Sequence, residues 1–239
     1  MSTHLVRDPL RWPSWQLPAP VASVERIVLL ASLFWTLSAN RSFFVAVLRG
    51  RSLSDPAAWG FAAAMLVLVL ALHVLLLGLL AHRWTVKPLL AVLTVMTALA
   101  GYYMGAFGIY LDPSMLRNVL RSDPAEAREL LSTALALHLL LYAGLPLLLL
   151  ARVRIVQRPW RQALARRFLL LAGALLALVA ALLLVFQPFA SLMRNHKELR
   201  YLITPANALW SISAVAAAEQ RGASQPRQII GEDAAPGPS

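Results

Sequence analysis

Hydrophobic residues make up 59% of this 239-residue chain and its mean hydropathy is +0.65, whereas soluble domains have an apolar share of about 45–50%. The composition excludes a soluble globular domain. It predicts an all-α polytopic membrane protein, because in hydrocarbon a helix satisfies all its backbone polar groups within its own segment. The chain has no cysteine, which excludes a disulfide framework, a thiol nucleophile and a thiolate metal site.

The positions of the basic residues indicate a membrane topology. The formal net charge of +11 is by itself compatible with a nucleic-acid partner. However, eleven Lys and Arg residues precede the first apolar run or lie in the second and fourth loops, and six lie in or beside the first and third loops. The positive-inside rule then predicts a cytoplasmic N-terminus and, after five crossings, a C-terminus outside. Topology and anionic lipid explain the basic excess, so we expect no nucleic-acid partner.

Five apolar runs are long enough to cross a bilayer, because about 20 helical residues span a hydrocarbon core about 30 Å thick. They cover residues 27–48, 57–81, 88–111, 130–151 and 168–189. We therefore expect a cytosolic tail (1–26), a domain of five transmembrane helices (27–189), short interfacial helices on the outer face (190–220) and a linker (221–239).

Several residues inside the spans are assigned structural roles. Asn40 is expected to face another helix and to form an interhelical hydrogen bond. His73 has no acid nearby in sequence, so we expect a packed, neutral side chain rather than a proton relay. Three glycines between residues 101 and 108 have the spacing that lets a neighbouring helix approach closely. Pro146 should kink the fourth span, because it removes one helical hydrogen bond.

Three Asp-Pro pairs predict helix starts on the outer face, at residues 55–56, 112–113 and 123–124. In each pair Asp is expected as the N-cap and Pro as the first helical residue. After the fifth span, apolar and charged residues alternate with helical period through residue 203, which predicts an amphipathic helix in the outer interface. A second short helix is expected from Ala206 to about Glu219.

Aromatic residues gather at the outer end of the third span, namely Tyr102, Tyr103, Phe107 and Tyr110. Such residues are enriched at membrane interfaces. They either anchor the helix among the head groups or line a pocket for a lipid head group.

The segment 115–131 is a polar island between two apolar runs, with carboxylates, arginines, an amide and a hydroxyl. A helix over 113–121 would place Asn118 and Ser122 one turn apart on one face, and the same spacing reaches Glu126. Pro124 disfavours helix at Asp123, so Asp123, Pro124 and Glu126 are expected to form a capping box at the start of the fourth span. Glu126 is then either a helix cap, or the anion that joins Asn118 and Ser122 in binding a cationic head group such as an ethanolamine ammonium.

Four stretches carry a family resemblance: ANRSFF (39–44), FGIYLDPSMLRNVLRSDPAEARELL (107–131), RNHKELRYLITP (194–205) and GEDA (231–234). From about residue 33 to residue 234 the chain resembles the N-terminal membrane domain of the lipid A phosphoethanolamine transferases, which include the mobile colistin resistance enzymes. The resemblance implies five transmembrane helices and outer loops that help to hold phosphatidylethanolamine. The family's Asn, Thr and Glu in phosphoethanolamine recognition fall on Asn118, Ser122 and Glu126, with Ser in place of Thr.

The resemblance also implies a function in the bacterial inner membrane, with a cytoplasmic N-terminus and a periplasmic C-terminus. The chain would be the membrane-anchoring, lipid-recognising part of an enzyme that moves phosphoethanolamine from phosphatidylethanolamine to lipid A, a modification linked to polymyxin resistance. In the family the linker leads to a periplasmic domain with a nucleophilic Thr and zinc ligands. These 239 residues contain no such domain, so we expect a truncated, inactive chain without catalytic residues, metal ligands or cofactor, and zinc only in the missing domain.

Two other functions are compatible with the sequence. One is a standalone, non-enzymatic membrane module that binds lipid or a partner transferase. The other is a small transporter, which ranks last because no internal repeat is visible and no acidic residue lies in the middle of a span.

Overall fold

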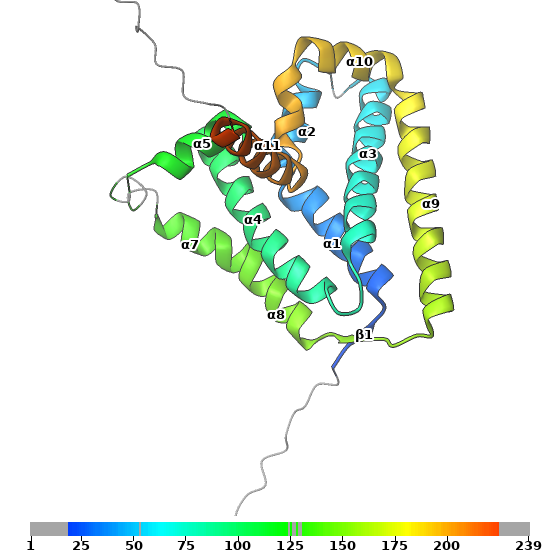
Figure 1. Ribbon diagram of the computed structural model, residues 1–239. Coiled ribbons are helices and arrows are strands. Elements are labelled where there is room, and N and C mark those ends of the chain that lie inside the picture. Colours follow the sequence, from blue (N-terminus) through cyan, green and yellow to red (C-terminus); the bar gives the residue numbers. More distant parts are fainter. Residues whose placement is uncertain (1–18, 53, 124, 126–127, 129–130, 225–239) are drawn as a thin grey trace, which may run out of the picture.

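The computed structural model describes residues 19–52, 54–123, 125, 128 and 131–224. It confirms the helical membrane fold (Figure 1). Among these residues, four helical segments are long and apolar enough to cross a membrane, and a bent pair of shorter helices raises the number to five. Short helices lie at the end of the bundle marked by α5 and α10, and a two-stranded parallel pair lies at the opposite end.

The elements follow one another in simple order along the chain. The spanning elements are α1 (Val24–Ser38), α2 (Arg41–Leu48), α3 (Pro56–Leu80), α4 (Val86–Phe107), α7 (Thr133–Leu139), the π-helical turn η1 (Leu140–Gly144), α8 (Leu145–Arg152) and α9 (Trp160–Leu184). The remaining elements are β1 (Val21–Ala22), α5 (Pro113–Arg121), β2 (Arg154–Ile155), α10 (Phe186–Asn195), the 3₁₀ helix η2 (Lys197–Leu202) and α11 (Ala206–Ser224).

The first span is not the single helix that the sequence predicted over residues 27–48. It breaks between α1 and α2, whose axes differ by 55°. Before the break, the hydroxyls of Thr36 and Ser38 donate to carbonyls four residues earlier, a contact that bends helices. Asn40, at the break, then donates its side-chain amide to the Trp35 carbonyl in the last turn of α1. Polar side chains thus compete with the regular backbone ladder at this point.

The fourth and fifth spans also differ from their predicted bounds. The described helix of the fourth span begins at Thr133, where the Ser132 hydroxyl caps the Leu135 N–H. The irregular turn η1 ends two residues before Pro146, as expected where proline removes a helical hydrogen bond. The fifth span, predicted over 168–189, is α9 and ends at Leu184.

The segment after the fifth span forms two helices rather than one. The predicted amphipathic helix through residue 203 is divided into α10 and η2 at His196, whose φ of −131° and ψ of 70° are not helical. Its first part also begins earlier, at Phe186, directly after the fifth span. The sequence therefore predicted the spans and the interfacial helices, but it did not predict the points where the chain turns between them.

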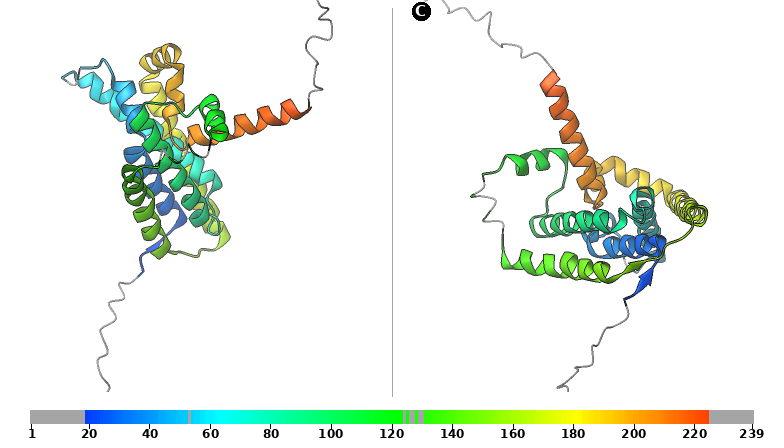
Figure 2. Two further views of the ribbon diagram at one scale, coloured as in Figure 1. Left: turned by 90° about the vertical axis from the view of Figure 1, so that its left-hand side faces the viewer. Right: turned by 60° about the horizontal axis from the view of Figure 1, so that its bottom comes forward.

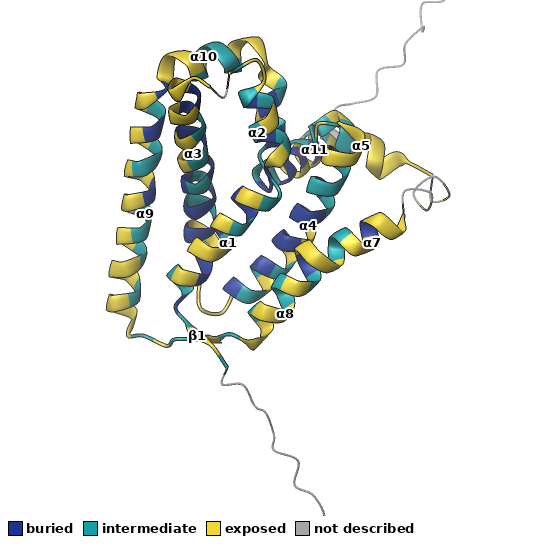
Figure 3. Ribbon diagram, turned by 180° about the vertical axis from the view of Figure 1, so that it is seen from behind, coloured by how far each residue is buried: buried dark blue, intermediate teal, exposed yellow. Residues whose placement is uncertain are grey.

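Burial separates the inner helices from the outer ones. In their most apolar windows, half of the α3 residues are buried, against 11% in α9 and in the α7–α8 segment. Figure 3 shows buried faces on α1, α3 and α4, and exposed faces along α7, α8 and α9. Since apolar side chains in a bilayer need no cover from protein, these exposed faces are suited to contact with lipid.

One glycine of the predicted small-residue stripe lies at a close contact between inner helices. A Cβ atom on Gly101 would lie 3.6 Å from Cα of Ala39, so α4 approaches the break of the first span closely. Gly105 has no described atom within 4 Å of such a Cβ position. Gly108 instead ends α4 in the left-handed conformation, with φ of 64°, which glycine adopts without steric cost.

A buried polar contact joins the first span to the segment before α11. Asn40 is fully buried; its amide donates to the Thr204 carbonyl at 3.0 Å and its Oδ1 accepts the Thr204 N–H at 2.9 Å. Nε2 of buried His73 lies 2.7 Å from the same carbonyl. A carbonyl only accepts, so Nε2 carries the proton. The packed position of His73 is confirmed. Asn40 does form a buried long-range contact, but its partner is the turn at Thr204 rather than the expected neighbouring helix.

Replacing Asn40 should destabilise the bundle more than replacing an exposed asparagine. Asn40→Ala leaves the buried Thr204 N–H without an acceptor, whereas the carbonyl keeps His73, so we expect a loss of about 1–3 kcal/mol in the free energy of unfolding. Asn118→Ala, on exposed α5, is the matched control and should change it by less than about 0.5 kcal/mol. Unfolding of the detergent-solubilised protein measures both, and equal values would contradict the role of Asn40.

Candidate functional site

The polar island begins at α5, which is held outside the bundle by α11. After Gly108 the chain crosses from α4 to Asp112, and the Ser211 hydroxyl of α11 donates to the Leu111 carbonyl at 2.9 Å. Figures 1 and 2 show α5 beside α11, at the end of the bundle opposite the strands. The contact fixes the backbone directly before α5 and so sets where the island lies.

Asp112 caps α5, as its Asp-Pro pair predicted. Its carboxylate accepts the Met115 N–H and the Ser114 hydroxyl, each at 2.7 Å. Burial acts to raise the pKa of Asp112, but these hydrogen bonds outweigh it and hold the pKa below the ordinary value of 3.8. Asp55 likewise caps α3 by accepting the Ala57 N–H at 2.9 Å.

Asn118 and Ser122 lie one turn apart at the end of α5, as predicted. Both are exposed, and the Ser122 hydroxyl donates to the Asn118 backbone carbonyl at 3.0 Å. The Ser122 oxygen therefore keeps lone pairs that can accept from a ligand. The Asn118 side chain has no hydrogen-bond partner within the part of the chain that the structure describes. Glu126 lies outside the described residues, so the convergence of all three stays a prediction.

The predicted capping box is only partly described. Asp123 accepts the Ala125 N–H at 2.8 Å, which fits its role as a cap, whereas Pro124 and Glu126 are not among the described residues. The helix of the fourth span has its own cap at Ser132. The expectation that the box around Asp123 opens that span is therefore wrong for the described helix.

The exposed surface of α5 is amphipathic. Val119 and Leu120 are 53% and 66% exposed, and Arg117 and Arg121 are exposed beside them. Exposed apolar groups next to arginines are typical of a helix that lies in a membrane interface. The exposed surface of α5 that includes Asn118 and Ser122 is therefore compatible with a position at a membrane interface.

Aromatic contacts join α4 to α7 near the island. The Tyr103 and Phe107 rings stack at 5.9 Å, and the Tyr102 ring lies 5.4 Å from that of His138. The Tyr102 hydroxyl also lies 2.9 Å from the Ser132 hydroxyl at the start of α7. The aromatic residues of α4 were visible in the sequence, but their contacts with the fourth span were not predicted.

The acidic and imidazole side chains of the described residues do not form a metal centre. None of them makes a group of three or more His, Asp or Glu that could hold an ion. His196 and Glu198 lie 3.2 Å apart and are exposed, which provides a pair only. The described island offers hydrogen-bonding groups for a ligand rather than a metal-activated nucleophile.

Comparisons with known proteins identify relatives over most of the chain. The family model "Phosphoethanolamine transferase EptA/EptB" matches residues 69–220. The chain is 31% identical to phosphatidylethanolamine transferase Mcr-1 of Escherichia coli over 211 residues, covering 87% of this chain and 39% of Mcr-1. It is 30% identical to phosphoethanolamine transferase EptA of E. coli strain K12 over 222 residues, covering 91% and 40%.

A solved structure agrees with these sequence matches. Lipooligosaccharide phosphoethanolamine transferase A (EptA) from Neisseria meningitidis, an integral membrane protein, matches with a TM-score of 0.81 and 26% identity. The match covers 87% of this chain and 39% of that protein. The chain therefore spans about two fifths of the length of the relatives it matches.

The cap at Asp112 should control how firmly α5 is folded. Asp112→Ala removes the cap and should lower the stability of α5 by about 1 kcal/mol, seen as faster amide hydrogen exchange over 115–121. Asp112→Ser keeps a capping oxygen and should exchange like the wild type.

The lowered pKa of Asp112 sets the pH dependence of this cap. Its stabilisation is present above the unfolded-state pKa, near 3.8, and is lost as the pH falls through the lower folded-state pKa. Exchange rates corrected for intrinsic chemistry should therefore show α5 loosening on acidification below about pH 3.8 in the wild type but not in Asp112→Ser. If the wild type and Asp112→Ser showed the same loosening of α5 on acidification, a titrating group other than Asp112 would be responsible.

Proposed function

Because this chain belongs to the phosphoethanolamine transferase family, we propose that it anchors such an enzyme and holds phosphatidylethanolamine at the periplasmic face of the bacterial inner membrane. The observation that carries the proposal is the exposed pair Asn118 and Ser122 at the end of an interfacial helix, with Ser122 Oγ bonded to the Asn118 carbonyl. The relatives Mcr-1 and EptA are transferases by name, which supports the substrate class.

The head group of phosphatidylethanolamine has two charges that suit this helix. Its ammonium has three donors, for which the Asn118 and Ser122 side-chain oxygens are acceptors and Glu126 is a counter-ion. Its phosphodiester suits the exposed Arg117 and Arg121, which are one turn apart. A phosphate alone would be repelled by Glu126, so the combination favours a zwitterionic head group.

The proposed orientation follows from the distribution of basic residues between the two ends. The strand pair β1–β2 and the turn between α3 and α4 lie at the end opposite α5 (Figure 1), and the arginines of those loops favour the cytoplasm. The N-terminus would then be cytoplasmic, and α11 would leave the bundle on the periplasmic side, where Figure 2 shows it projecting from the bundle.

In this proposal the phosphoryl chemistry belongs to a catalytic domain that these 239 residues do not contain. The chain spans only 39–40% of its transferase relatives. Displacement at phosphorus in a metal-assisted site needs several ligands around an ion, and we expect zinc, a nucleophile and the acceptor lipid A to be bound by that domain. The present chain would bind phosphatidylethanolamine without transferring its head group.

The charge of Glu126 should matter for lipid binding beyond any capping role. Glu126→Gln should weaken binding of phosphatidylethanolamine to the purified chain about tenfold, because charge-assisted hydrogen bonds contribute about 1.5–3 kcal/mol. Native mass spectrometry in detergent measures the affinity. Arg128→Gln, two residues away and exposed, is the control. Ser122→Ala should weaken binding less than Glu126→Gln does, and Ser122→Thr should bind like the wild type. If Glu126→Gln bound the lipid as tightly as the wild type, Glu126 would have only a capping role.

The purified chain should show no transferase activity by itself. Supplied with phosphatidylethanolamine, zinc and lipid A, it should form no modified lipid A detectable by mass spectrometry, whereas a complete relative in the same assay provides the positive control. Any turnover by the purified chain would contradict the proposed division between lipid binding and chemistry.

A further inference from the structure

A second site lies at the end of the bundle opposite α5. A cavity of about 270 Å³ opens between the N-terminus of α1, the C-terminus of α3 and the N-terminus of α9. Its inner wall is apolar and includes Val28 and Ala81, both buried. Its charged residues are Glu25, Arg83, Arg158 and Arg167. An apolar wall with charged residues at its mouth fits an amphiphile rather than a water-soluble ion.

The charges around this cavity leave an excess of positive charge. Glu25 and Arg158 form an ion pair at 3.1 Å, and their side chains are 19% and 22% exposed. Arg167 donates to the Leu79 carbonyl in the last turn of α3. The Arg83 guanidinium lies over the Trp84 ring at 4.6 Å and has no ion-pair partner among the described residues. Three arginines thus face one carboxylate that is already paired.

The backbone of α9 adds to this positive potential. The helix starts at the cavity with Pro159 as its N-cap, and no side chain caps its first turn. Free N–H groups and the helix dipole favour an anion at such an end. The α1 helix is different, because the Ser23 hydroxyl already accepts the Arg26 N–H. An anion in the cavity would therefore find donors on α9 that no side chain satisfies.

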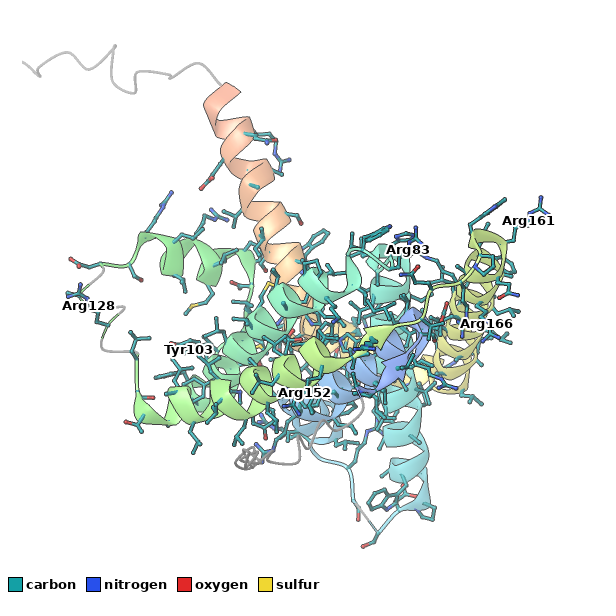
Figure 4. The ribbon with its side chains drawn as sticks, turned by 90° about the horizontal axis from the view of Figure 1, so that it is seen from below. Arg83, Tyr103, Arg128, Arg152, Arg161 and Arg166 are labelled. Carbon is teal, nitrogen blue, oxygen red and sulfur yellow. The ribbon has the colours of Figure 1, made fainter. Side chains whose placement is uncertain are left out.

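An exposed apolar track leads from the cavity along α9. Trp160, Leu164 and Phe168 follow one another at intervals of four residues, which places them on one face, and they are 70%, 59% and 70% exposed. Trp160 and Leu164 also line the cavity. Tryptophan favours the membrane interface, so this face is suited to an acyl chain whose head group lies in the cavity. Figure 4 shows further arginines at this end, among them Arg152, Arg161 and Arg166.

We propose that this cavity binds the head group of an anionic phospholipid from the leaflet opposite α5. The phosphodiester would bind Arg83 and the first turn of α9, and an acyl chain would follow the Trp160, Leu164 and Phe168 face. Basic pockets between helices on the cytoplasmic side are the usual form of such sites. A zwitterionic ethanolamine lipid fits less well, because the carboxylate of Glu25 is occupied by Arg158. The site is separate from the one proposed for phosphatidylethanolamine on α5.

The head-group contact is tested with the whole chain in detergent micelles. Native mass spectrometry should show phosphatidylglycerol binding more tightly than phosphatidylethanolamine. Arg83→Gln should weaken phosphatidylglycerol binding about fivefold, the factor for about 1 kcal/mol per arginine near anionic lipid. Arg152→Gln removes the same charge from an exposed residue at the same end of the molecule that does not line the cavity, and it should stay within about twofold of the wild type. An equal effect of both variants would overturn the proposal, because it would indicate only general attraction to the surface.

A second variant separates the lipid from a free phosphate. Leu164→Trp adds bulk at the cavity entrance without changing charge, and since Leu164 is exposed the chain should fold with unchanged thermal stability in the absence of lipid. It should abolish the rise in melting temperature that phosphatidylglycerol gives the wild type. Inorganic phosphate should give no such rise. Equal stabilisation by inorganic phosphate, or an undiminished response in Leu164→Trp, would overturn the lipid site.

Discussion

The buried hydrogen bonds between Asn40 and the Thr204 backbone are the interaction on which the outer end of the molecule depends. They join residues 164 positions apart in sequence and hold the return segment after η2 in the bundle. From there, Asn207 donates to the Tyr201 carbonyl at 2.7 Å, and Ser211 reaches the backbone before α5. In hydrocarbon an unpaired backbone group costs several kcal/mol, so this contact favours one position for α11 and, through it, for α5.

The two ends of the bundle present different chemistry to the two leaflets. The α5 end combines an amide, a hydroxyl and arginines on an exposed helix. The opposite end has a cavity where three arginines meet one paired carboxylate. A mixed set of acceptors and cations suits a zwitterion, whereas an excess of cations over an apolar wall suits an anion. The net charge of +11 by itself does not distinguish these two ends of the molecule.

Local signals predicted the parts of the fold that depend on a few neighbouring residues. Asp112 and Asp55 cap their helices as their Asp-Pro pairs indicated, and the helix irregularity precedes Pro146. The break at Asn40 was missed because its partner lies at Thr204, and a hydropathy window cannot detect a contact so distant in sequence. The cavity was missed for the same reason: its charged lining comes from three separated segments of the chain, near residues 25, 83 and 158–167. Three residues were predicted to bind the lipid head group. For two of them, Asn118 and Ser122, the sequence spacing correctly predicted that they lie close together, since both lie within two turns of helix.

The geometry of α11 bears on how a held lipid would be presented to a catalytic domain. The sequence predicted a helix to about Glu219 and a linker from residue 221, whereas α11 continues through Ser224. Nineteen helical residues extend about 28 Å, and the base of this helix is fixed by Asn207 and Ser211. The same helix packs against α5, so α11 is in direct contact with the helix of the proposed lipid site. The hydrogen bond from Ser211 to the backbone before α5 would then couple the position of α5 to that of α11.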